Sequence, residues 1–325
     1  MKEFIINKND ANQRLDKFIS KAVPLLPQSL MYKYIRSKRI KVNAKRSEIS
    51  YRLQPNDLIE MYINDEFFES TKPKYDFLGA GKSIDIVYED ENILLINKPA
   101  GILSHPDEGN YTDTAITRAK RYLYEKGEYL PDSENSFAPA LVNRIDRNTS
   151  GIIICAKNAE ALRILNLKLK NRELHKYYLC VAIGKLKNKS GLIEGYLQKN
   201  EKQNRVYISD TNNGGSKSIA TAYKVLDYKN GLSLIEVELL TGRTHQIRAS
   251  FSHLGNPLLG DGKYGTNAQN KEFGGYKKQF LCSYKLVFDF TSDAGILSYL
   301  NHKEFRVNDI WFKTAFYEGT IISNK

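Results

Sequence analysis

Asn143-Arg144-Ile145-Asp146-Arg147-Asn148-Thr149-Ser150-Gly151 leads directly into a run of three isoleucines, Ile152 to Ile154. The β-branched run predicts a buried strand, and the Thr-Ser-Gly ending of the quoted stretch predicts a tight loop before that strand. Asp146 stands between two arginines, whose charges favour the ionised carboxylate. A carboxylate that stays ionised in a cleft can act as a nucleophile or a base. A salt-bridged turn without chemistry would give the same local pattern, so both interpretations stay open at this point.

Short apolar segments on both sides of this stretch read as strands separated by turn residues. Leu162, Leu165 and Leu169 recur at helical spacing and predict one helix over residues 159–170. Strands outnumber helices, and the short loops between several of them favour antiparallel pairing, so we expect an α+β domain. The expected strands are residues 84–88, 93–96, 152–154, 177–183, 220–226 and 232–240.

The first 63 residues form a pattern of their own. An apolar series at helical spacing from Leu15 to Val23 predicts a helix that Asn12 would cap, and a second short helix is expected to start at Ser29. Strands are expected near residues 39–42 and 58–63, on either side of turn residues. The total length of 325 residues favours two domains over one. We therefore predict a small N-terminal domain over 1–63, a linker over 64–83 and a second domain over 84–325.

One motif at the end of the linker resembles a nucleotide-binding P-loop. Gly81-Lys82-Ser83 matches the end of that motif, which also requires a glycine five positions before Gly81, where Asp76 stands. No apolar strand leads into the segment, and no helical period follows it. We therefore reject nucleotide binding here.

Positive charge dominates the chain, with 49 Lys and Arg against 37 Asp and Glu, a formal net charge of +12. Such an excess indicates a polyanionic partner, because cations that neutralise phosphates release counterions on binding. Seven basic residues lie between positions 33 and 46 without one acidic residue, and a solvated surface helix usually mixes both signs. We predict that this basic cluster binds an RNA backbone. The basic cluster consists of Lys33, Arg36, Lys38, Arg39, Lys41, Lys45 and Arg46.

Cysteine usage and the N-terminus indicate a protein of the cytoplasm. Cys155, Cys180 and Cys282 stand far apart and form no CxxC pair, which argues against a disulfide framework and a structural zinc site. The first ten residues hold no apolar core of a signal peptide, and no apolar run reaches membrane-spanning length. We expect a cytoplasmic protein without membrane contact.

Two further segments carry a high density of polar groups. Thr241-Gly242-Arg243-Thr244-His245-Gln246-Ile247-Arg248 places two arginines, a histidine and a glutamine at the end of an apolar strand. Lys176-Tyr177-Tyr178 places a basic residue beside two tyrosines, and a tyrosine ring can stack on a nucleobase. Tyrosines in strands more often serve packing, so the second segment alone carries little weight.

Together these segments resemble the RluA-type pseudouridine synthases. Arg144 to Gly151 is similar to the family signature around its catalytic aspartate, and the segment from Thr241 to Arg248, continued through 255–265, is similar to a later signature. Residues 93–106 also fit, and the N-terminal unit resembles the alpha-L (S-four-like) RNA-binding domain. The resemblance implies an α+β pseudouridine synthase fold: a mixed, mainly antiparallel central sheet with flanking helices, preceded by a small α+β RNA-binding domain.

The resemblance also implies a site. Asp146 matches the catalytic aspartate, Tyr178 the tyrosine that packs against the target uracil, and Arg248 the arginine that pairs with the aspartate. Arg144 matches an RNA-binding arginine that fills the space left by the flipped base, and Leu281 falls near a residue that lines the uracil pocket. Asn143 and Cys282-Ser283 depart from the family pattern, which has histidine before Arg-Leu-Asp and Leu-His-Ala at the second place.

The implied reaction breaks the C1′–N1 bond of a uridine in structured RNA, rotates the uracil and rejoins it through C5, without cofactor or metal. Attack of Asp146 on C1′ and removal of a sugar proton by Asp146 both require its ionised form. By family analogy we expect ribosomal RNA of the large subunit rather than transfer RNA, and a monomeric enzyme.

Two alternatives belong to other classes of protein. A non-catalytic RNA-binding or ribosome-assembly factor on the same fold would also need the basic cluster, but it would not need Asp146, Tyr178 and Arg248 together. A metal-dependent or histidine-based nuclease would need paired ligands, and none of the five histidines stands at metal-ligand spacing from a carboxylate. His245 is interpreted as a structural member of its loop.

Overall fold

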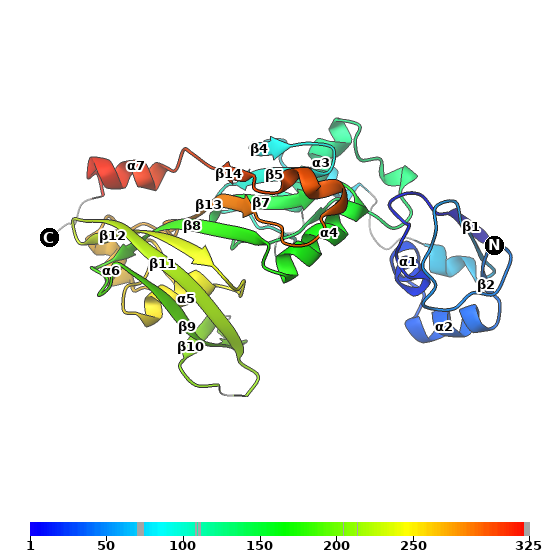
Figure 1. Cartoon of the computed structure of the whole chain (residues 1–325), viewed down its shortest axis with the longest axis horizontal. Helices are drawn as coiled ribbons and strands as arrows, with labels where there is room; N and C mark the ends of the chain where they lie inside the picture. The colour runs from blue at the N-terminus through cyan, green and yellow to red at the C-terminus, as the bar shows by residue number, and fades with distance from the viewer. Residues whose placement is uncertain (70–74, 108, 110–111, 204, 213, 322–325) are drawn as a thin grey trace.

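The N-terminal part of the chain folds as a three-stranded antiparallel sheet with two helices (Figure 1). The computed structural model describes residues 1–69, 75–107, 109, 112–203, 205–212 and 214–321. Phe18, Ile19 and Met31 are buried between the helices and the sheet and form the centre of a separate small core. The elements are β1 (Lys2–Ile5), α1 (Leu15–Ala22), α2 (Gln28–Arg36), β2 (Ile40–Val42) and β3 (Leu58–Met61), and the sheet order is β1-β3-β2.

The predicted cap of the first helix is wrong. Asn12 adopts a left-handed backbone with φ 63°, a conformation that asparagine tolerates better than most residues, and the helix begins three residues later. Arg14 occupies the N-cap position and makes no side-chain capping bond. The second helix also begins one residue before the expected Ser29, after Pro27.

The rest of the described chain is built on one large mixed sheet of 11 strands. Only the pair β7 and β13 is parallel among its named pairs, and the other neighbours run antiparallel. The path is β10-β9-β11-β12-β8-β13-β7-β5-β4, with β14 beside β13 and β6 beside β7. The strands are β4 (Ile86–Glu89), β5 (Ile93–Lys98), β6 (Ala140–Leu141), β7 (Ser150–Ala156), β8 (Leu174–Ile183), β9 (Ser190–Asn200), β10 (Arg205–Ser209), β11 (Lys217–Lys229), β12 (Leu232–Leu239), β13 (Leu281–Phe288) and β14 (Glu304–Arg306).

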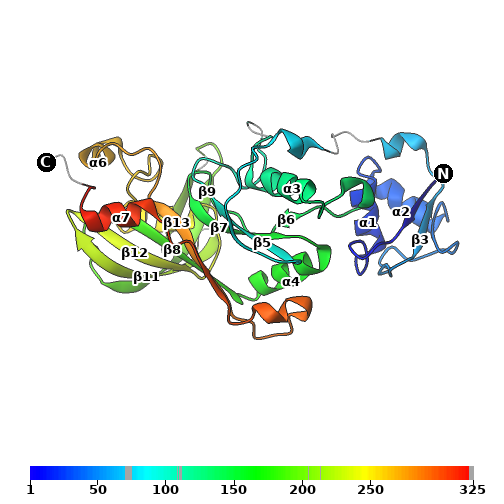
Figure 2. The same ribbon diagram turned by 90° about the horizontal axis from the view of Figure 1, so that it is seen from above.

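Helices cover both faces of this sheet, and β7 presents apolar residues to each face. Ile152 and Ile154 join one core cluster with α4, whereas Ile153 and Cys155 join another with α3, as the alternation of side chains along a strand requires. Figure 2 shows α3 and α4 on opposite sides of β5 and β7. The helices are α3 (Ala115–Glu125), α4 (Ala159–Lys170), α5 (Gln246–His253), α6 (Asn267–Glu272) and α7 (Trp311–Glu318).

The expected α+β class and mainly antiparallel sheet are confirmed. The helix expected over 159–170 has those bounds, with Asn158 as its N-cap. The expected strands are all present with somewhat different ends, while α3, α5, α6 and α7 were not predicted. The predicted linker contains two 3-10 helices, η1 (Asp65–Phe68) and η2 (Asp76–Gly79), and further 3-10 turns are η3 (Pro131–Ser133) and η4 (Gly295–Leu300).

Gly81-Lys82-Ser83 precedes a strand, β4, and not the helix that a P-loop requires. The domain boundaries at 63 and 84 stay a prediction. Within the described ranges, no helix combines the length and the apolar character needed to cross a membrane.

Candidate active site

The end of β5 and the segment after it hold the Asp146 loop in place, by contacts with the residues just before and just after Asp146. Lys98 is buried, and its ammonium group donates to the backbone carbonyl of Arg147 at 3.0 Å. Ser104 donates to the carbonyl of Ile145 at 2.8 Å and accepts from its N–H at 3.2 Å. Because the residues before and after Asp146 are both fixed, these contacts hold the backbone of the loop in place at Asp146.

A glycine brings β13 close to the end of this loop. Gly151 has φ +109°, and a Cβ at this position would lie 2.2 Å from the backbone oxygen of Ser283. Any other residue would therefore force β7 and β13 apart at their parallel contact. This contact places β13 directly beside the Asp146 loop.

Arg248 connects Asp146 to a second carboxylate. Its Nη1 donates to Asp146 Oδ2 at 3.0 Å, while Nε and Nη2 form a two-pronged contact with Asp261 at 2.7 and 2.9 Å. Asp261 also accepts from the backbone N–H groups of Lys263 and Tyr264. Burial alone would raise the pKa of Asp261, but its hydrogen bonds to Arg248 and the charge of that residue lower it overall. Asp261 is thus charged at neutral pH and orients Arg248 towards Asp146.

His245 faces Asp146 from the other side of this network. Burial lowers its pKa, so the imidazole is neutral at pH 7. Its Nδ1 lies 2.9 Å from the hydroxyl of Tyr264, which itself accepts the N–H of Val206 at 3.0 Å. His245 Nε2 lies 3.9 Å from Asp146 Oδ2. His245 thus lies between the hydroxyl of Tyr264 and the carboxylate of Asp146.

Tyr178 and Leu281 lie on the neighbouring strands β8 and β13, in one apolar cluster with Ile145. Burial raises the pKa of Tyr178, a hydrogen bond with Ser283 lowers it, and the charge of Asp146 raises it further. The net shift is upward, so the phenol is neutral at neutral pH. The structure thus brings the predicted pocket residues together around the Asp146 loop.

The two arginines that flank Asp146 in the sequence lie at the surface, and the hydrogen-bond donor to the Asp146 carboxylate is Arg248. Both Arg144 and Arg147 are exposed, and Arg147 lies 3.5 Å from Asp107 instead. Neighbours along an extended loop point in different directions, so adjacency in sequence does not give contact. The ion pair of Asp146 is made by Arg248, which is 102 positions away. Arg144 is free to contact RNA from the surface.

The residues that depart from the family pattern lie beside the site and are not part of the ion pair of Asp146 and Arg248. Asn143 accepts the backbone N–H of Ile154 at 2.8 Å and so supports strand β7. Cys282 is buried in the apolar core on one side of the sheet. Ser283 donates to the carbonyl of Ile152 at 3.2 Å and also bonds Tyr178, so it is the departure that reaches the pocket.

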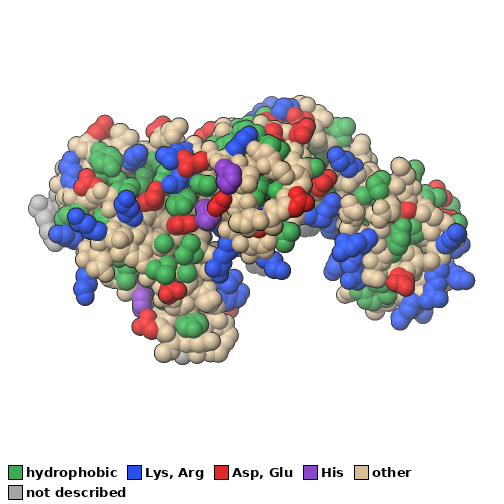
Figure 3. All heavy atoms as spheres, in the orientation of Figure 1, with side chains coloured by type: hydrophobic (Ala, Val, Ile, Leu, Met, Phe, Trp, Pro, Cys, Tyr) green, Lys and Arg blue, Asp and Glu red, His purple; other side chains and the backbone are tan. Residues whose placement is uncertain are grey.

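The basic cluster lies on α2, β2 and the turns that follow them. Six of its residues are exposed, and Lys41 is half-buried. Arg39 and Lys41 lie over the rings of Tyr34 and Tyr62, at 5.1 and 5.0 Å from the ring centres. Figure 3 shows Lys and Arg side chains along the lower side of the small N-terminal domain.

Sequence reasoning missed three residues of the site: Lys98, Asp261 and Tyr264. The residues from 93 to 106 and from 255 to 265 were recognised only as parts of family signatures, without a role for these side chains. A lysine inside an otherwise apolar strand is a signal in itself, since such a residue is rarely fully buried without partners. Asp261 and Tyr264 follow Gly260 in a segment that reads as an ordinary turn.

We expect the Lys98→Met variant to be less stable than wild type by about 1–3 kcal/mol, because carbonyl groups that Lys98 now satisfies would lose their donor. Lys98 donates to three backbone carbonyls, those of Pro99, Ile102 and Arg147. Urea unfolding of both proteins measures the difference, with Lys82→Met at an exposed position as the control. Equal unfolding midpoints for wild type and Lys98→Met would contradict the supporting role given to Lys98.

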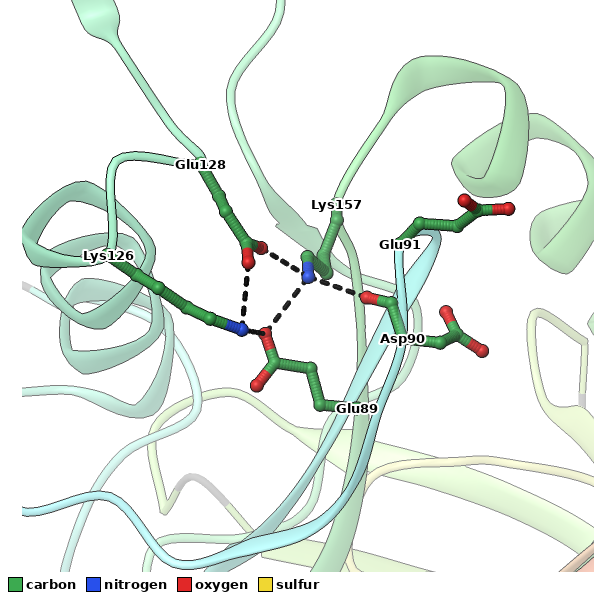
Figure 4. Close-up of a pocket in the computed structure, with 6 residues that line it drawn as sticks. All are labelled: Glu89, Asp90, Glu91, Lys126, Glu128 and Lys157. Atoms are coloured by element: carbon green, nitrogen blue, oxygen red, sulfur yellow. Dashed lines mark hydrogen bonds and ion pairs between the residues drawn. The ribbon is translucent and has the colours of Figure 1, made fainter.

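A polar hollow of about 440 Å³ lies beside β4 and the end of α3, and Figure 4 shows its lining. Lys126 and Lys157 each contact both Glu89 and Glu128, so the cations and carboxylates neutralise one another. None of the six lining residues is a predicted site residue. We interpret this hollow as a surface ion-pair network that joins α3 to β4 and β7.

The described residues contain no group of three or more His, Cys, Asp or Glu side chains arranged to hold a metal ion. The polar groups around Asp146 are one guanidinium, one neutral imidazole and one second carboxylate already bound by that guanidinium. This arrangement places a single carboxylate against a guanidinium and beside a buried tyrosine.

Comparisons with known proteins point to one family for this chain. The family model described as RNA pseudouridylate synthase matches residues 92–253, and the S4 domain model matches residues 13–59. An uncharacterized RNA pseudouridine synthase of Mycoplasma capricolum is 36% identical over 318 residues, which are 96% of this chain and 99% of that protein. The chain belongs to the RNA pseudouridylate synthase family. As a pseudouridylate synthase it is an isomerase, and its matched region contains Asp146, Tyr178 and Arg248.

Two further proteins extend the comparison. The ribosomal large subunit pseudouridine synthase C of Rickettsia conorii is 34% identical over 277 residues, which cover 82% of this chain and 86% of that protein. The solved structure of the human RNA pseudouridylate synthase domain containing 4 has a TM-score of 0.55 at 18% identity, over 71% of this chain and 90% of that one. The likeness to the human structure shows a shared fold and nothing further about function. The S4 domain of this synthase carries the basic cluster.

Proposed function

We propose that this synthase isomerises one or more uridines in the ribosomal RNA of the large subunit, with Asp146 as the catalytic residue. The observation that carries the proposal is the ion pair of Asp146 and Arg248 beside the buried Tyr178. The choice of RNA is supported by relatives that carry the name ribosomal large subunit pseudouridine synthase C. We further propose that it acts as a monomer in the cytoplasm, where its three unpaired cysteines would stay reduced.

The proposed chemistry uses groups of this chain alone. Arg248 donates to Asp146 and places a positive charge beside its carboxylate, which can attack C1′ or remove a proton from the sugar while the C1′–N1 bond breaks. The uracil then turns and bonds to C1′ through C5, and the proton that C5 loses is replaced at N1. No atom is gained or lost in the whole reaction, so no co-reactant is required.

Tyr178 and Arg144 have supporting roles in the proposal. A uridine must leave the RNA stack to reach Asp146, which costs a few kcal/mol. The ring of Tyr178 would offset part of that cost by packing against the uracil, and the exposed Arg144 would contact the RNA where the base has left. Leu281 would line the same pocket from β13.

The direct test is a reaction with purified protein and unmodified RNA. We expect pseudouridine to form when ribosomal RNA transcribed in vitro is incubated with the protein in buffer with EDTA and no other additive. Nucleoside analysis after complete digestion measures the product. Loss of activity in EDTA that added Mg²⁺ or Zn²⁺ restores, in RNA shown to stay folded, would favour metal chemistry and contradict the proposal.

The basic cluster gives a separate prediction about binding. We expect a triple variant with Lys33, Arg36 and Arg46 changed to alanine to bind RNA more weakly and with less dependence on salt. Each lost phosphate contact reduces the slope of log affinity against log salt by about 0.9. Fluorescence anisotropy over a range of salt concentrations measures the slope. Lys313→Ala on α7, at the other end of the molecule, is the control and should leave the slope unchanged (Figure 1).

A further inference from the structure

The S4 domain and the catalytic domain meet in a contact made of hydrogen bonds. Asp10 is fully buried, and its two carboxylate oxygens accept from Ser136 at 2.6 Å and from Asn135 at 2.7 Å. Asn135 also donates to the backbone carbonyl of Ile5 at 2.9 Å, and Gln13 donates to Ser136 at 2.9 Å. We call this set of interactions, with those of Asn9 and Arg163 described next, the docking contact.

The S4 domain also completes the start of helix α4. The first N–H groups of a helix have no partner within it. Asn158 accepts the N–H of Ala161, and Asn9 of the S4 domain accepts the N–H of Ala159 at 3.1 Å. On the next turn, Arg163 donates to the carbonyl of Ala11 at 3.3 Å. The S4 domain thus contacts both α4 and the segment before β6.

The docking contact specifies one orientation of the two domains. A buried carboxylate without partners costs free energy, so Asp10 can be buried only where Asn135 and Ser136 meet it. Hydrogen bonds are directional, and a small rotation would break several of them at once. A chain connection alone leaves relative domain motion as the default, so the contact is what fixes the arrangement.

The basic cluster and the docking contact lie on different elements of the S4 domain. Asp10 and Asn9 lie in the segment before α1, whereas the cluster lies on α2, β2 and the following turns. Figure 1 shows the S4 domain at one end of the molecule, and Figure 3 shows a hollow between it and the projecting strands β9 to β11. RNA bound to the cluster is therefore held at a fixed offset from Asp146.

We propose that the docking contact selects the target uridine, because it fixes the distance and direction from the basic cluster to Asp146. This inference rests on the proposed function. A large RNA that is held by the S4 domain presents only the uridine at the matching offset. If the contact is broken, the S4 domain still binds RNA but no longer directs one uridine to the site. The contact then determines which uridine reaches the site and its effective concentration there, and it leaves the chemical step unchanged.

The test uses variants of the full chain that break the contact from the catalytic side and, separately, from the S4 side. Asn135→Ala with Ser136→Ala removes the two side-chain donors to Asp10 and leaves the S4 core intact. Asn9→Ala removes the contacts of Asn9 with both Ala159 and Glu134. Asn166→Ala, at an exposed position of α4, is the matched control. Small-angle X-ray scattering reports the domain arrangement. Activity is measured on ribosomal RNA from cells without the gene and on a short hairpin with the mapped uridine.

We expect the double variant to show a more extended scattering profile and to modify the short hairpin at the wild-type rate. On ribosomal RNA, kcat/KM at the native uridine should fall by about tenfold, with new pseudouridines at other positions. Wild-type selectivity on ribosomal RNA, an unchanged scattering profile, or an equal loss on both RNAs would each overturn the inference. Absence of product with the wild-type protein on both RNAs would instead contradict the proposed function, and the inference with it.

Discussion

We expect the Asp146→Asn variant to form no measurable pseudouridine while it still binds RNA. Asparagine has the same shape and can accept the hydrogen bond from Arg248, but it carries no charge and is neither a nucleophile nor a base at neutral pH. The flanking contacts of Lys98 and Ser104 are to backbone atoms, so they persist. The rate should fall by a factor on the order of 10⁴ or more.

Single-turnover kinetics with excess enzyme measures this loss, and fluorescence anisotropy measures RNA binding in parallel. Asp309→Asn at an exposed position is the control, because it makes the same chemical change away from the site. Substantial product with Asp146→Asn, or a loss of RNA binding that matches the loss of product, would contradict the catalytic role of Asp146.

The second large effect is expected for Arg248→Lys. Arg248 contacts Asp146 and Asp261 with three different N–H groups, and a lysine cannot reproduce that planar fork. Asp261 is 1% exposed, so its carboxylate would be left buried with a poorer partner. We expect a loss of kcat of about 10²–10³-fold, as for other preorganised groups that act on a reacting centre. Arg248→Ala should also lower the free energy of unfolding by about 3–5 kcal/mol.

The pH dependence of unfolding tests whether the ion pair of Arg248 and Asp261 is the source of this stability. The pKa of Asp261 is lowered from its ordinary value of 3.8, so its pairing with Arg248 contributes stability at neutral pH that is lost as pH falls below about 4. The difference in unfolding free energy between wild type and Arg248→Ala should therefore shrink between pH 5 and pH 3. A difference that stays constant over this range, measured by urea unfolding, would show that the ion pair is not its source.

Local sequence patterns predicted secondary structure well where one signal dominated. The leucine series predicted α4 with its observed start, and the isoleucine run predicted β7. Asn12 was misread because asparagine favours both helix caps and left-handed turns, and here the second preference holds. Helix α3 carried a readable signal in the capping box of Thr114 and Thr117, which was overlooked.

The site depended on long-range contacts that no local pattern contains. Asp146 and Arg248 were paired by resemblance to a family, since 102 residues separate them. The arginines next to Asp146 were expected to favour its charge, and the structure shows both exposed, with Arg147 beside Asp107. Asp261 and Lys98 act by holding other groups in place, and such roles become visible only once the partners are brought together in the fold.

The central claim is that this chain makes pseudouridine in ribosomal RNA through Asp146. The most direct measurement is a map of pseudouridines in total RNA from cells with and without the gene, by chemical labelling and primer extension. We predict that one or a few sites in the large-subunit RNA are lost without the gene, return with the wild-type gene and stay absent with Asp146→Asn. An unchanged map, or full restoration by Asp146→Asn, would contradict it.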